Sequence, residues 1–574
     1  MKSSRSSAAT LAACIAAIVT SAGAASAAAT LEKVIKNTEA VPGIAGVAWS
    51  ASPFQTPTID ISGKVGLRGT LLNGTGGVTS SNNATMWYGG PGDLGFVART
   101  GQQAPGLPAG QNVIGFQSQN LNLSPNGHMW FGGTSTAPSG YLGTGTFFGG
   151  ITKAARNGEV LPGVGSAISF NPASTSNYQN VNNLGHTIVG TSLADGTNAM
   201  WVGNSASLNL AFQSGQSYAG LLASTTVRSV ITGAMINGSG TLYSGILMNQ
   251  NAGAGITDAN NELLTTLPFG GNTFTQIARE GDAAPGAGGA TYQRGLFNQI
   301  LQIEDSSFFH INGNFNNLGH GIYSTGLEGA GVVGSTNNAA LFYYDGTSAN
   351  MLRRRGDMTS AVPGATYALN AQQAFNARVN NNDEVAMTMS LTQGVGGVTS
   401  ANDATLMRTT LGSAVDTLLA REGSGVPIVP GALWGTSFAN LMQNNAGQIV
   451  FASTMLDDPT NPNHNITAAN DLALFAWDPV GGFSLIARDG ESLASIGINL
   501  TLTGNWLGTF NSANAEGGAN ALSDNGWLTF RVTGTALPGF TDTSAIVRTL
   551  IPAPASAVAL LFGGIAALRR RRRA

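Results

Sequence analysis

The most regular residue able to do chemistry in this sequence is an arginine inside a short recurring pattern, the opening unit. An apolar run precedes the arginine, then come one residue and a glycine, usually with Pro-Gly a few residues later. The arginines concerned are Arg99, Arg156, Arg279, Arg354, Arg421 and Arg488. A ring of guanidinium groups around a channel could bind anions or acidic glycans. The alternative is structural, with each arginine bonding carbonyls or a carboxylate of the next module. Because a ligand site rarely needs six equivalent cations, the regularity favours the structural role.

A second candidate is the polar turn Asn380–Glu384, whose oxygen atoms could suit Ca²⁺. Its spacing is not that of an EF-hand loop, and asparagine in a turn already has a conformational reason. We therefore predict no cofactor, with calcium at this turn as the weaker alternative, and the sequence leaves the metal content open.

Catalytic motifs are scarce. The histidines are His128, His186, His310, His320 and His464. None belongs to a His-Glu-x-x-His zinc motif, and the chain has neither a Gly-x-Ser-x-Gly elbow nor a phosphate-binding loop. The tripeptide Arg355-Gly356-Asp357 falls at the ordinary position of the opening unit, so we do not interpret it as a cell-attachment motif. The sequence thus predicts no catalytic residues and no enzyme.

Two further units follow the opening unit in fixed order. The second is roughly Asn-x-x-Gly before alternating apolar residues, with copies at Asp60–Gly63, Pro125–Gly127, Asn182–Gly185, Asn237–Gly240, Asn316–Gly319, Asn380–Asp383, Asn444–Gly447 and Asp524–Gly526. The third is a short apolar run, as in Asn83–Trp87, Asn198–Trp201, Asn338–Phe342, Asn402–Leu406 and Asp471–Phe475. Weaker copies of the opening unit at Val34–Thr38 and Ala211–Gly215 complete a set of eight. Three units in fixed order indicate a repeat architecture.

Each repeat contains about four short apolar segments separated by Gly, Asn and Pro-Gly turns, the pattern of antiparallel strands. Gly contributes 79 residues, which fits tight turns because glycine adopts positive φ without steric cost. The predicted fold class is all-β, a β-propeller-like array of about eight four-stranded modules. A β-solenoid or a string of small β-sandwiches is the alternative.

Composition and the first residues limit the function. Charged residues make up 10% of the chain and the formal net charge is −3, which gives no clustered basic face for nucleic acid. Residues 1–27 have a basic start, an apolar stretch and a small-residue cleavage site ending at Ala27, which predicts a secretory signal peptide. Cys14 is the only cysteine and lies in that leader, so we expect no disulfide. The repeat domain is predicted over residues 30–548.

Residues 551–574 form a separate segment. Pro552 and Pro554 precede the apolar run Ala555–Leu568, and five basic residues close the chain: Arg569, Arg570, Arg571, Arg572 and Arg573. The run is short for a full bilayer crossing, and the arginines would hold the C-terminus on the cytoplasmic side. This tail resembles the PEP-CTERM sorting signal of Gram-negative bacteria, although Ala553 stands where those signals carry Glu. The alternative is a plain tail-anchor transmembrane helix.

The repeats are similar to those of choice-of-anchor surface proteins, in which an Asn-x-x-Gly-x-x-Ala-Phe repeat precedes an interchangeable anchor; Asn444–Phe451 is close to that repeat. The two resemblances imply an exosortase-type sorting enzyme and the membrane as partners. They also imply transient inner-membrane anchoring and a final location at the cell surface, outer membrane or extracellular matrix. The expected function is a non-enzymatic adhesion or scaffold role, with extracellular polysaccharide as an expected partner. The alternative is a carbohydrate-binding or glycan-hydrolysing β-propeller.

Overall fold

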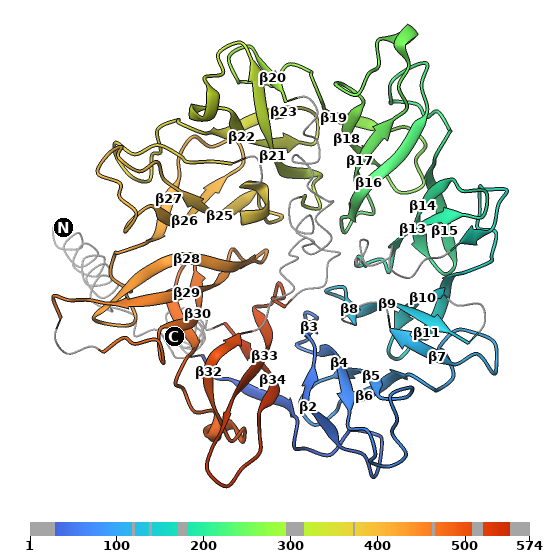
Figure 1. Cartoon of the computed structure of the whole chain (residues 1–574), viewed down its shortest axis with the longest axis vertical. Coiled ribbons are helices and arrows are strands. Elements are labelled where there is room, and N and C mark those ends of the chain that lie inside the picture. Colours follow the sequence, from blue (N-terminus) through green and yellow to red (C-terminus); the bar gives the residue numbers. More distant parts are fainter. Residues whose placement is uncertain are drawn as a thin grey trace, which may run out of the picture.

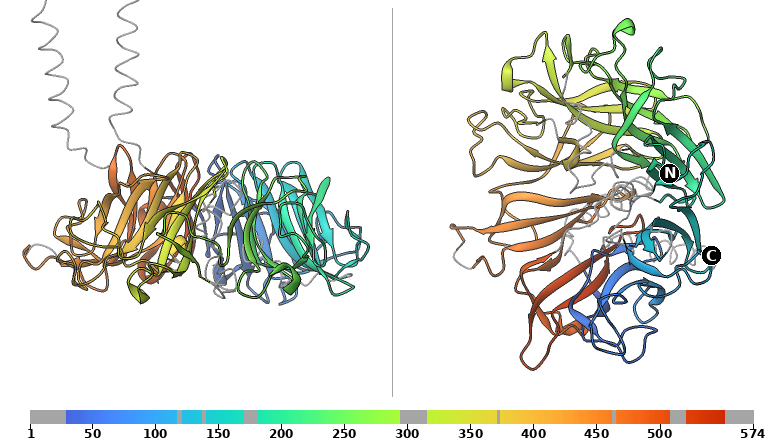
Figure 2. Two further views of the ribbon diagram at one scale, coloured as in Figure 1. Left: turned by 90° about the horizontal axis from the view of Figure 1, so that it is seen from above. Right: turned by 45° about the vertical axis from the view of Figure 1, so that its right-hand side comes forward.

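A computed structural model of the chain describes residues 29–116, 121–136, 140–169, 181–293, 315–370, 373–461, 465–507 and 521–551. Eight antiparallel sheets surround a common axis (Figure 1). Edge-on, they form a flattened disc (Figure 2). The protein is an all-β, eight-bladed β-propeller, which confirms the predicted fold class.

The strands of blades I to IV follow one another along the chain. Blade I contains β2 (Trp49–Phe54), β3 (Thr58–Ile59), β4 (Val65–Leu71), β5 (Ala84–Gly89) and β6 (Gly95–Arg99). Blade II contains β7 (Val113–Phe116), β8 (Asn122–Leu123), β9 (His128–Ser135), β10 (Gly140–Thr146) and β11 (Gly150–Arg156). Blade III contains β12 (Ile168–Ser169), β13 (Thr187–Leu193), β14 (Asn198–Asn204) and β15 (Ser207–Gln213). Blade IV contains β16 (Val227–Ile236), β17 (Leu242–Met248), β18 (Glu262–Leu267) and β19 (Thr275–Arg279).

Blades V to VIII complete the circle. Blade V contains β20 (Ala290–Tyr292), β21 (His320–Gly329), β22 (Ala339–Asp345) and β23 (Ala349–Arg354). Blade VI contains β24 (Ala377–Val379), β25 (Glu384–Ser390), β26 (Ala404–Thr410) and β27 (Thr417–Arg421). Blade VII contains β28 (Ala432–Gln443), β29 (Ile449–Asp457), β30 (Leu472–Asp478) and β31 (Gly482–Arg488). Blade VIII contains β32 (Leu500–Leu507), β33 (Trp527–Ala536), β34 (Ser544–Leu550) and β1 (Glu32–Lys36).

Helices among the described residues are single 3₁₀ turns: η2 (Ala252–Ala254), η3 (Gly334–Thr336), η4 (Gln373–Asn376) and η5 (Ala494–Ile496). Within the described part of the chain, no helix has the length and apolar character needed to cross a membrane. The predicted signal peptide with Ala27, and the sorting segment with Pro552, Pro554 and Arg569–Arg573, lie outside the described residues.

Closure of the propeller joins the two ends of the chain. We call the strands of a blade A to D in sheet order. In blade VIII, strands A to C come from the C-terminal end, and strand D is β1, with Glu32 opposite Arg548 and Lys36 opposite Ala545. The opening unit ends strand D in every blade, so the sequence repeat begins one strand before the blade does. This offset closes the propeller. The first opening unit, Val34–Thr38, comes before the strands of blade I, and its strand β1 instead pairs with β34 as strand D of blade VIII.

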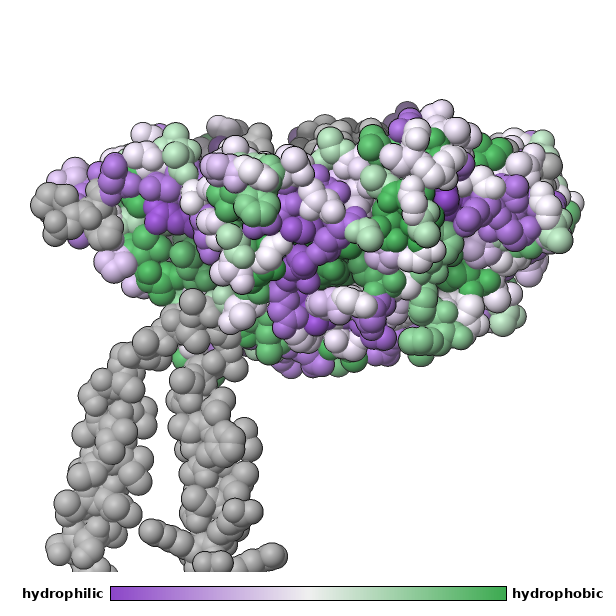
Figure 3. Space-filling model, turned by 90° about the horizontal axis from the view of Figure 1, so that it is seen from below, coloured by the Kyte–Doolittle hydropathy of each residue, from purple (hydrophilic) through white to green (hydrophobic). Residues whose placement is uncertain are grey.

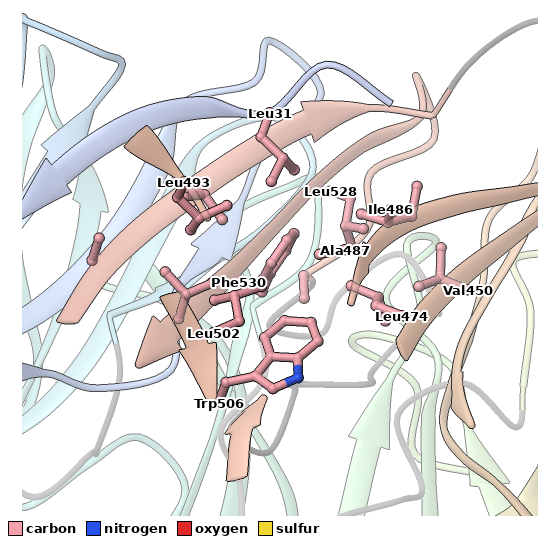
Figure 4. Packing of buried hydrophobic residues seen from close by; sticks show 14 of the residues in the cluster. Leu31, Val450, Leu474, Ile486, Ala487, Leu493, Leu502, Trp506, Leu528 and Phe530 are labelled. Atoms are coloured by element: carbon pink, nitrogen blue, oxygen red, sulfur yellow. The ribbon is translucent and has the colours of Figure 1, made fainter. Parts of the chain in front are cut away.

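The hydrophobic core is divided among the blade interfaces. Alternate residues of β30 illustrate this: Ala473 and Phe475 pack toward blade VI, whereas Leu474 and Ala476 pack toward blade VIII. Figure 4 shows the second of these clusters, in which Leu474 and Ile486 of blade VII meet blade VIII around Trp506. Both faces of β30 are therefore buried in the middle of the strand, which is why this segment reads as a continuous apolar run.

The propeller has two distinct ends because antiparallel strands alternate in direction. The A–B turns and the C–D hairpins lie on one end, which we call the turn face. The B–C loops and the D-to-A connections lie on the other end, the loop face. Around the edge, hydrophilic and hydrophobic patches alternate (Figure 3).

Candidate functional site

The Asn-x-x-Gly units are the A–B turns, and each one bonds to the turn of the next blade. The amide nitrogen of the first asparagine donates to a main-chain carbonyl of the following turn. The pairs are Asn182 Nδ2 to Asn237 O (3.1 Å), Asn237 to Asn316 (2.9 Å), Asn316 to Asn380 (2.9 Å), Asn380 to Asn444 (3.2 Å) and Asn444 to Ser523 (2.9 Å).

In a parallel series of bonds, a main-chain N–H of one turn donates to the second side chain of the next turn. The donor is the second residue of the turn, except in blade II, where the second residue is Pro125 and the donor is Asn126 at the third position. The pairs are Asn126 N to Asn183 Oδ1 (3.2 Å), Gly238 to Asn317 (2.6 Å), Asn317 to Asn381 (2.9 Å), Asn381 to Asn445 (2.8 Å) and Asn445 to Asp524 (3.0 Å). Asn525 Nδ2 donates to Ile61 O (3.0 Å), and Ile61 N donates to Pro125 O (2.9 Å). Every blade interface is thus bridged, and the turns make a closed circuit that we call the turn ring.

The first asparagine serves its own turn as well. In blade V, Asn316 Oδ1 accepts the N–H groups of Leu318 and His320, both at 3.0 Å, while its Nδ2 points to the next blade. The fourth position is glycine because φ is positive there and the preceding blade approaches closely. A Cβ on Gly185 would lie 2.9 Å from His128 Nδ1, and one on Gly63 would lie 2.8 Å from the Trp527 ring.

Blade VI departs from this rule, since Asp383 occupies the glycine position with φ of 60°. Its carboxylate accepts Asn316 Nδ2 (2.7 Å) and lies 3.0 Å from His320 Nδ1. Glu384 bonds Arg408 and, at 2.9 Å, Asn380 Nδ2. Asn380–Glu384 is the turn at which calcium was the alternative prediction. Its two carboxylates, Asp383 and Glu384, face N–H groups of the protein. Among the described residues, no cluster of three or more His, Cys, Asp or Glu has metal-binding geometry.

The role of Asp383 can be separated from its backbone strain by two variants. Asp383→Ala should lose the contacts to Asn316 and His320 while keeping the positive φ, and should lower the free energy of unfolding by about 2 kcal/mol. Asp383→Gly loses the same contacts but adopts that φ freely, so its loss should be about 1 kcal/mol smaller. Urea unfolding measures both. Equal free energies of unfolding for the two variants would show that the positive φ causes no strain. A wild-type free energy of unfolding for Asp383→Gly would show that the contacts of Asp383 do not stabilise the protein.

Two other histidines occupy the position that follows the turn glycine. His186 stacks on Phe269 with ring centroids 4.0 Å apart, and His128 lies against Gly185 of the next blade. Burial lowers the pKa of both histidines, and for His186 the neighbouring His128 lowers it further. They are neutral packing groups of the ring at physiological pH.

The six recurring arginines lie on the outermost strands of blades I, II and IV to VII. Five of them bond within their own blade. Their Nε atoms donate to the carbonyl of an asparagine in the B–C loop: Arg99 to Asn82 (2.6 Å), Arg279 to Asn260 (2.8 Å), Arg354 to Asn337 (2.8 Å), Arg421 to Asn402 (2.7 Å) and Arg488 to Asn470 (2.5 Å). Arg156 Nε is buried and has no hydrogen-bond partner among the described residues. The partners are carbonyls of the same blade, not groups of the next blade, and the arginines do not line a channel at the turn ring.

In blades I, IV, VI and VII the residue after this arginine is buried beside the start of strand C. In blades VI and VII it is an acid next to a second acid, in the pairs Asp403–Glu422 and Asp471–Asp489. Burial and, to a lesser degree, Asp403 raise the pKa of Glu422. Burial and the charge of Asp471 raise the pKa of Asp489 to about 6. Asp489 is 5% exposed, and its Oδ1 has no hydrogen-bond partner among the described residues.

This pKa predicts a pH-dependent cost. An unfolded aspartate ionises near pH 4 and Asp489 near pH 6, so the free energy of unfolding should fall as pH rises between these values. Asp489→Asn removes the cost, and should raise the free energy of unfolding at pH 7 by roughly 1–3 kcal/mol while changing it little at pH 4. Urea unfolding at both pH values measures this. The control is Asp258→Asn on an exposed loop, and a pH-independent effect of Asp489→Asn would contradict the assignment.

A cavity of about 260 Å³ lies between blades V and VI. Its lining includes Tyr343, Met351, Arg353, Asp357 and Tyr367. The five N–H groups of Arg353 are all used, by the Asp416 carboxylate, by Thr409 Oγ1 and by the carbonyls of Leu352 and Ser413. Arg353 thus joins the two blades and has no donor left for a ligand. Asp357 is the single carboxylate in the lining, whereas glycoside hydrolysis ordinarily uses two.

Asp357 also ends the Arg-Gly-Asp tripeptide. Gly356 N donates to Tyr367 O (2.9 Å), and Tyr367 N donates to Asp357 O (3.0 Å). The same pair of bonds joins Gly281 and Asp282 to Tyr292 in blade V. The tripeptide therefore has the ordinary backbone geometry of the D-to-A connection.

Comparisons with known proteins bear on the fold and the family. A model described as "Family of unknown function (DUF7453)" matches residues 7–307 and 302–558. No curated protein matches the sequence. A prolyl endopeptidase is similar with a TM-score of 0.35 and 10% identity over 76% of this chain, which covers 50% of the endopeptidase. The β-propeller domain of the Trilobed protease from Pyrococcus furiosus is similar with a TM-score of 0.32 and 9% sequence identity. That match covers 77% of this chain and 99% of the domain. Saccharomyces cerevisiae Sqt1 is similar with a TM-score of 0.28 and 10% sequence identity, and the match covers 79% of this chain and 100% of Sqt1.

Proposed function

Because this chain belongs to DUF7453, a family of unknown function, we propose its role from its own architecture. It is an exported, non-catalytic scaffold or adhesion protein of the cell surface or extracellular matrix. Its C-terminal segment directs sorting by an exosortase-type enzyme, and extracellular polysaccharide is its partner.

The observation that carries this proposal is the use made of the repeated polar residues. The asparagines of the turn ring and five recurring arginines direct their hydrogen bonds to the framework itself. Such groups hold neighbouring strands and blades in fixed positions, which suits a rigid platform. The loops joining the strands are rich in Asn, Ser, Thr and Gly, whose uncharged hydrogen-bonding groups suit contacts with hydrated glycans.

Fractionation of native cells tests the proposal. The full-length protein is compared with a variant that lacks residues 552–574, and intact masses are measured in the envelope, surface and medium fractions. We expect the native protein without residues 1–27, accessible to protease added to intact cells, and the truncated variant released into the medium. A cytoplasmic protein that retains residues 1–27 would contradict export, and equal retention of both forms would contradict sorting through the tail.

Adhesion is tested in a deletion strain. Loss of the gene should reduce attachment to a surface coated with the strain's own extracellular polysaccharide, and the full-length gene should restore it. The truncated gene should not. Unchanged attachment of the deletion strain would contradict the adhesive role.

A further inference from the structure

Both ends of the described chain leave the propeller at the turn face. Blade VIII has no C–D hairpin, because its strand C is the last strand of the chain and its strand D is the first. Strand β34 ends with Leu550 opposite Trp527, the first residue of β33. Ile551 N then donates to Gly526 O of the A–B turn (2.9 Å), and Thr549 Oγ1 donates to Thr30 O (2.9 Å). The C-terminal segment therefore begins beside the turn ring.

The chain between the sheet and the apolar segment is very short. The apolar run starts at Ala555, four residues after Ile551. Four fully extended residues reach at most about 14 Å. A bilayer that holds this run must therefore lie close to the turn face, while the loop face is about a strand length farther away, on the order of 20 Å.

The turn face also carries side chains suited to a lipid surface. Phe148 at the tip of the β10–β11 hairpin is 84% exposed, and Val480 at the tip of the β30–β31 hairpin is 75% exposed. Leu184 and Leu318 occupy the third position of their A–B turns and are 53% and 59% exposed. Lys64 Nζ lies 5.0 Å above the Phe148 ring. An aromatic ring beside a lysine is typical of the boundary between lipid headgroups and acyl chains.

We propose that the turn face rests on the lipid bilayer that holds the C-terminal segment, with the apolar hairpin tips at the headgroup level. The loop face then points away from the membrane and presents the B–C loops to partners. This inference rests on the proposed sorting through the C-terminal segment, which includes the transient membrane anchoring expected from the sequence, and it adds the orientation of the propeller.

Paired cysteine labels test the orientation in the full-length protein. Cys14 is the only cysteine, so Cys14→Ala gives a background free of thiols. Ala401 and Ala414 are exposed and flank β26 on the loop face and the turn face, and Ala194 and Ala206 flank β14 in the same way. Each is changed to cysteine and labelled with a fluorophore. The protein is reconstituted in vesicles of phosphatidylethanolamine and phosphatidylglycerol that carry a headgroup-attached quencher.

We expect quenching at Ala414→Cys and Ala206→Cys to be several-fold greater than at Ala401→Cys and Ala194→Cys. Equal or reversed quenching on vesicle-bound protein would overturn the orientation alone. Protein that does not float with the vesicles and is quenched at no site would overturn the anchor, and with it that part of the proposed function.

A second variant tests the hairpin contact. Phe148→Ser should reduce the quenching of a label at Ala206→Cys on the neighbouring blade, whereas Val333→Ser on the loop face, a side chain 65% exposed, should not. Flotation should persist in both variants because the tail is intact. Unchanged quenching in Phe148→Ser would overturn the contact between the hairpin and the lipid.

Discussion

Replacing Asn316 by alanine should lower the free energy of unfolding by about 3–4 kcal/mol, one of the largest effects expected from a single change in this protein. Asn316 is 1% exposed. It donates to Asn380 O and to the Asp383 carboxylate, and it accepts the N–H groups of Leu318 and His320. Truncation leaves these groups buried beside a gap, and each unsatisfied group costs on the order of 1–3 kcal/mol.

A second change at the same position separates the turn from the ring. Asn316→Asp keeps the oxygen that accepts the two N–H groups of its own turn, but it replaces the donating Nδ2 by an oxygen that faces Asn380 O and the Asp383 carboxylate. If the bond between blades is the stabilising one, Asn316→Asp should lower the free energy of unfolding by most of the amount that Asn316→Ala does. Urea unfolding measures both. The control is Asn204→Ala, where a hairpin asparagine makes one local bond to Ala206 N (3.0 Å) and a loss of about 1 kcal/mol or less is expected. A wild-type value for Asn316→Asp would show that the ring adds nothing to the turn.

The fold could be predicted from the sequence because each blade repeats the same turn chemistry. Gly281 and Gly356 mark the end of strand D, and the alternation of Ala473 to Ala476 reveals a strand buried on both faces. The position of the blade boundary could not be read in this way. The repeat has no inherent first strand, and only the pairing of Glu32 with Arg548, 516 residues apart, shows where the circle closes.

The candidate site was less accessible to sequence reasoning for a different reason. Asparagine at the start of a turn has a sufficient local explanation, so nothing in a single copy indicates a bond to the next blade. The available signal was the asparagine doublet, as at Asn316-Asn317 and Asn444-Asn445, because one turn needs only the first of the two. The doublet could have suggested a second, non-local role for the residue that follows. The structural role predicted for the recurring arginines was a bond to carbonyls or a carboxylate of the next blade. That prediction is wrong about the blade, because the carbonyls belong to the B–C loop of the same blade, such as Asn402 for Arg421.

Closure of the propeller should depend strongly on Asp542, which is 1% exposed. Its carboxylate accepts Lys36 Nζ (2.9 Å), the Thr38 hydroxyl and Asn499 N (2.6 Å), and so ties the end of β1 to blade VIII. Asp542→Ala leaves a half-buried ammonium group and a main-chain N–H without their acceptor. The free energy of unfolding should fall by about 3–5 kcal/mol, the usual cost of removing one member of a buried ion pair. Urea unfolding measures this loss.

The pKa of Asp542 allows a second test of its role in closure, the dependence of the free energy of unfolding on pH in the acid range. Burial alone would raise this pKa, but hydrogen bonds from Thr38, Lys36 and Asn499 outweigh it and lower the pKa below its ordinary value. The stabilisation is therefore complete above about pH 4, where an unfolded aspartate is ionised, and is lost as pH falls through the lower folded value. In Asp542→Ala this loss in acid should be absent.

The damage should also be local, because β1 pairs with β34 and this carboxylate bonds the C-terminal end of β1. Hydrogen exchange of the β34 amides opposite β1 should therefore accelerate far more in Asp542→Ala than exchange in β26, which lies on another blade, and trypsin should cut sooner after Lys33 and Lys36. The matched control is Asp195→Ala, since Asp195 is an exposed loop aspartate that accepts hydrogen bonds from Thr197 nearby. Uniform acceleration across all blades would show that the ring opens as one unit, and an unchanged β34 would show that closure does not depend on Asp542.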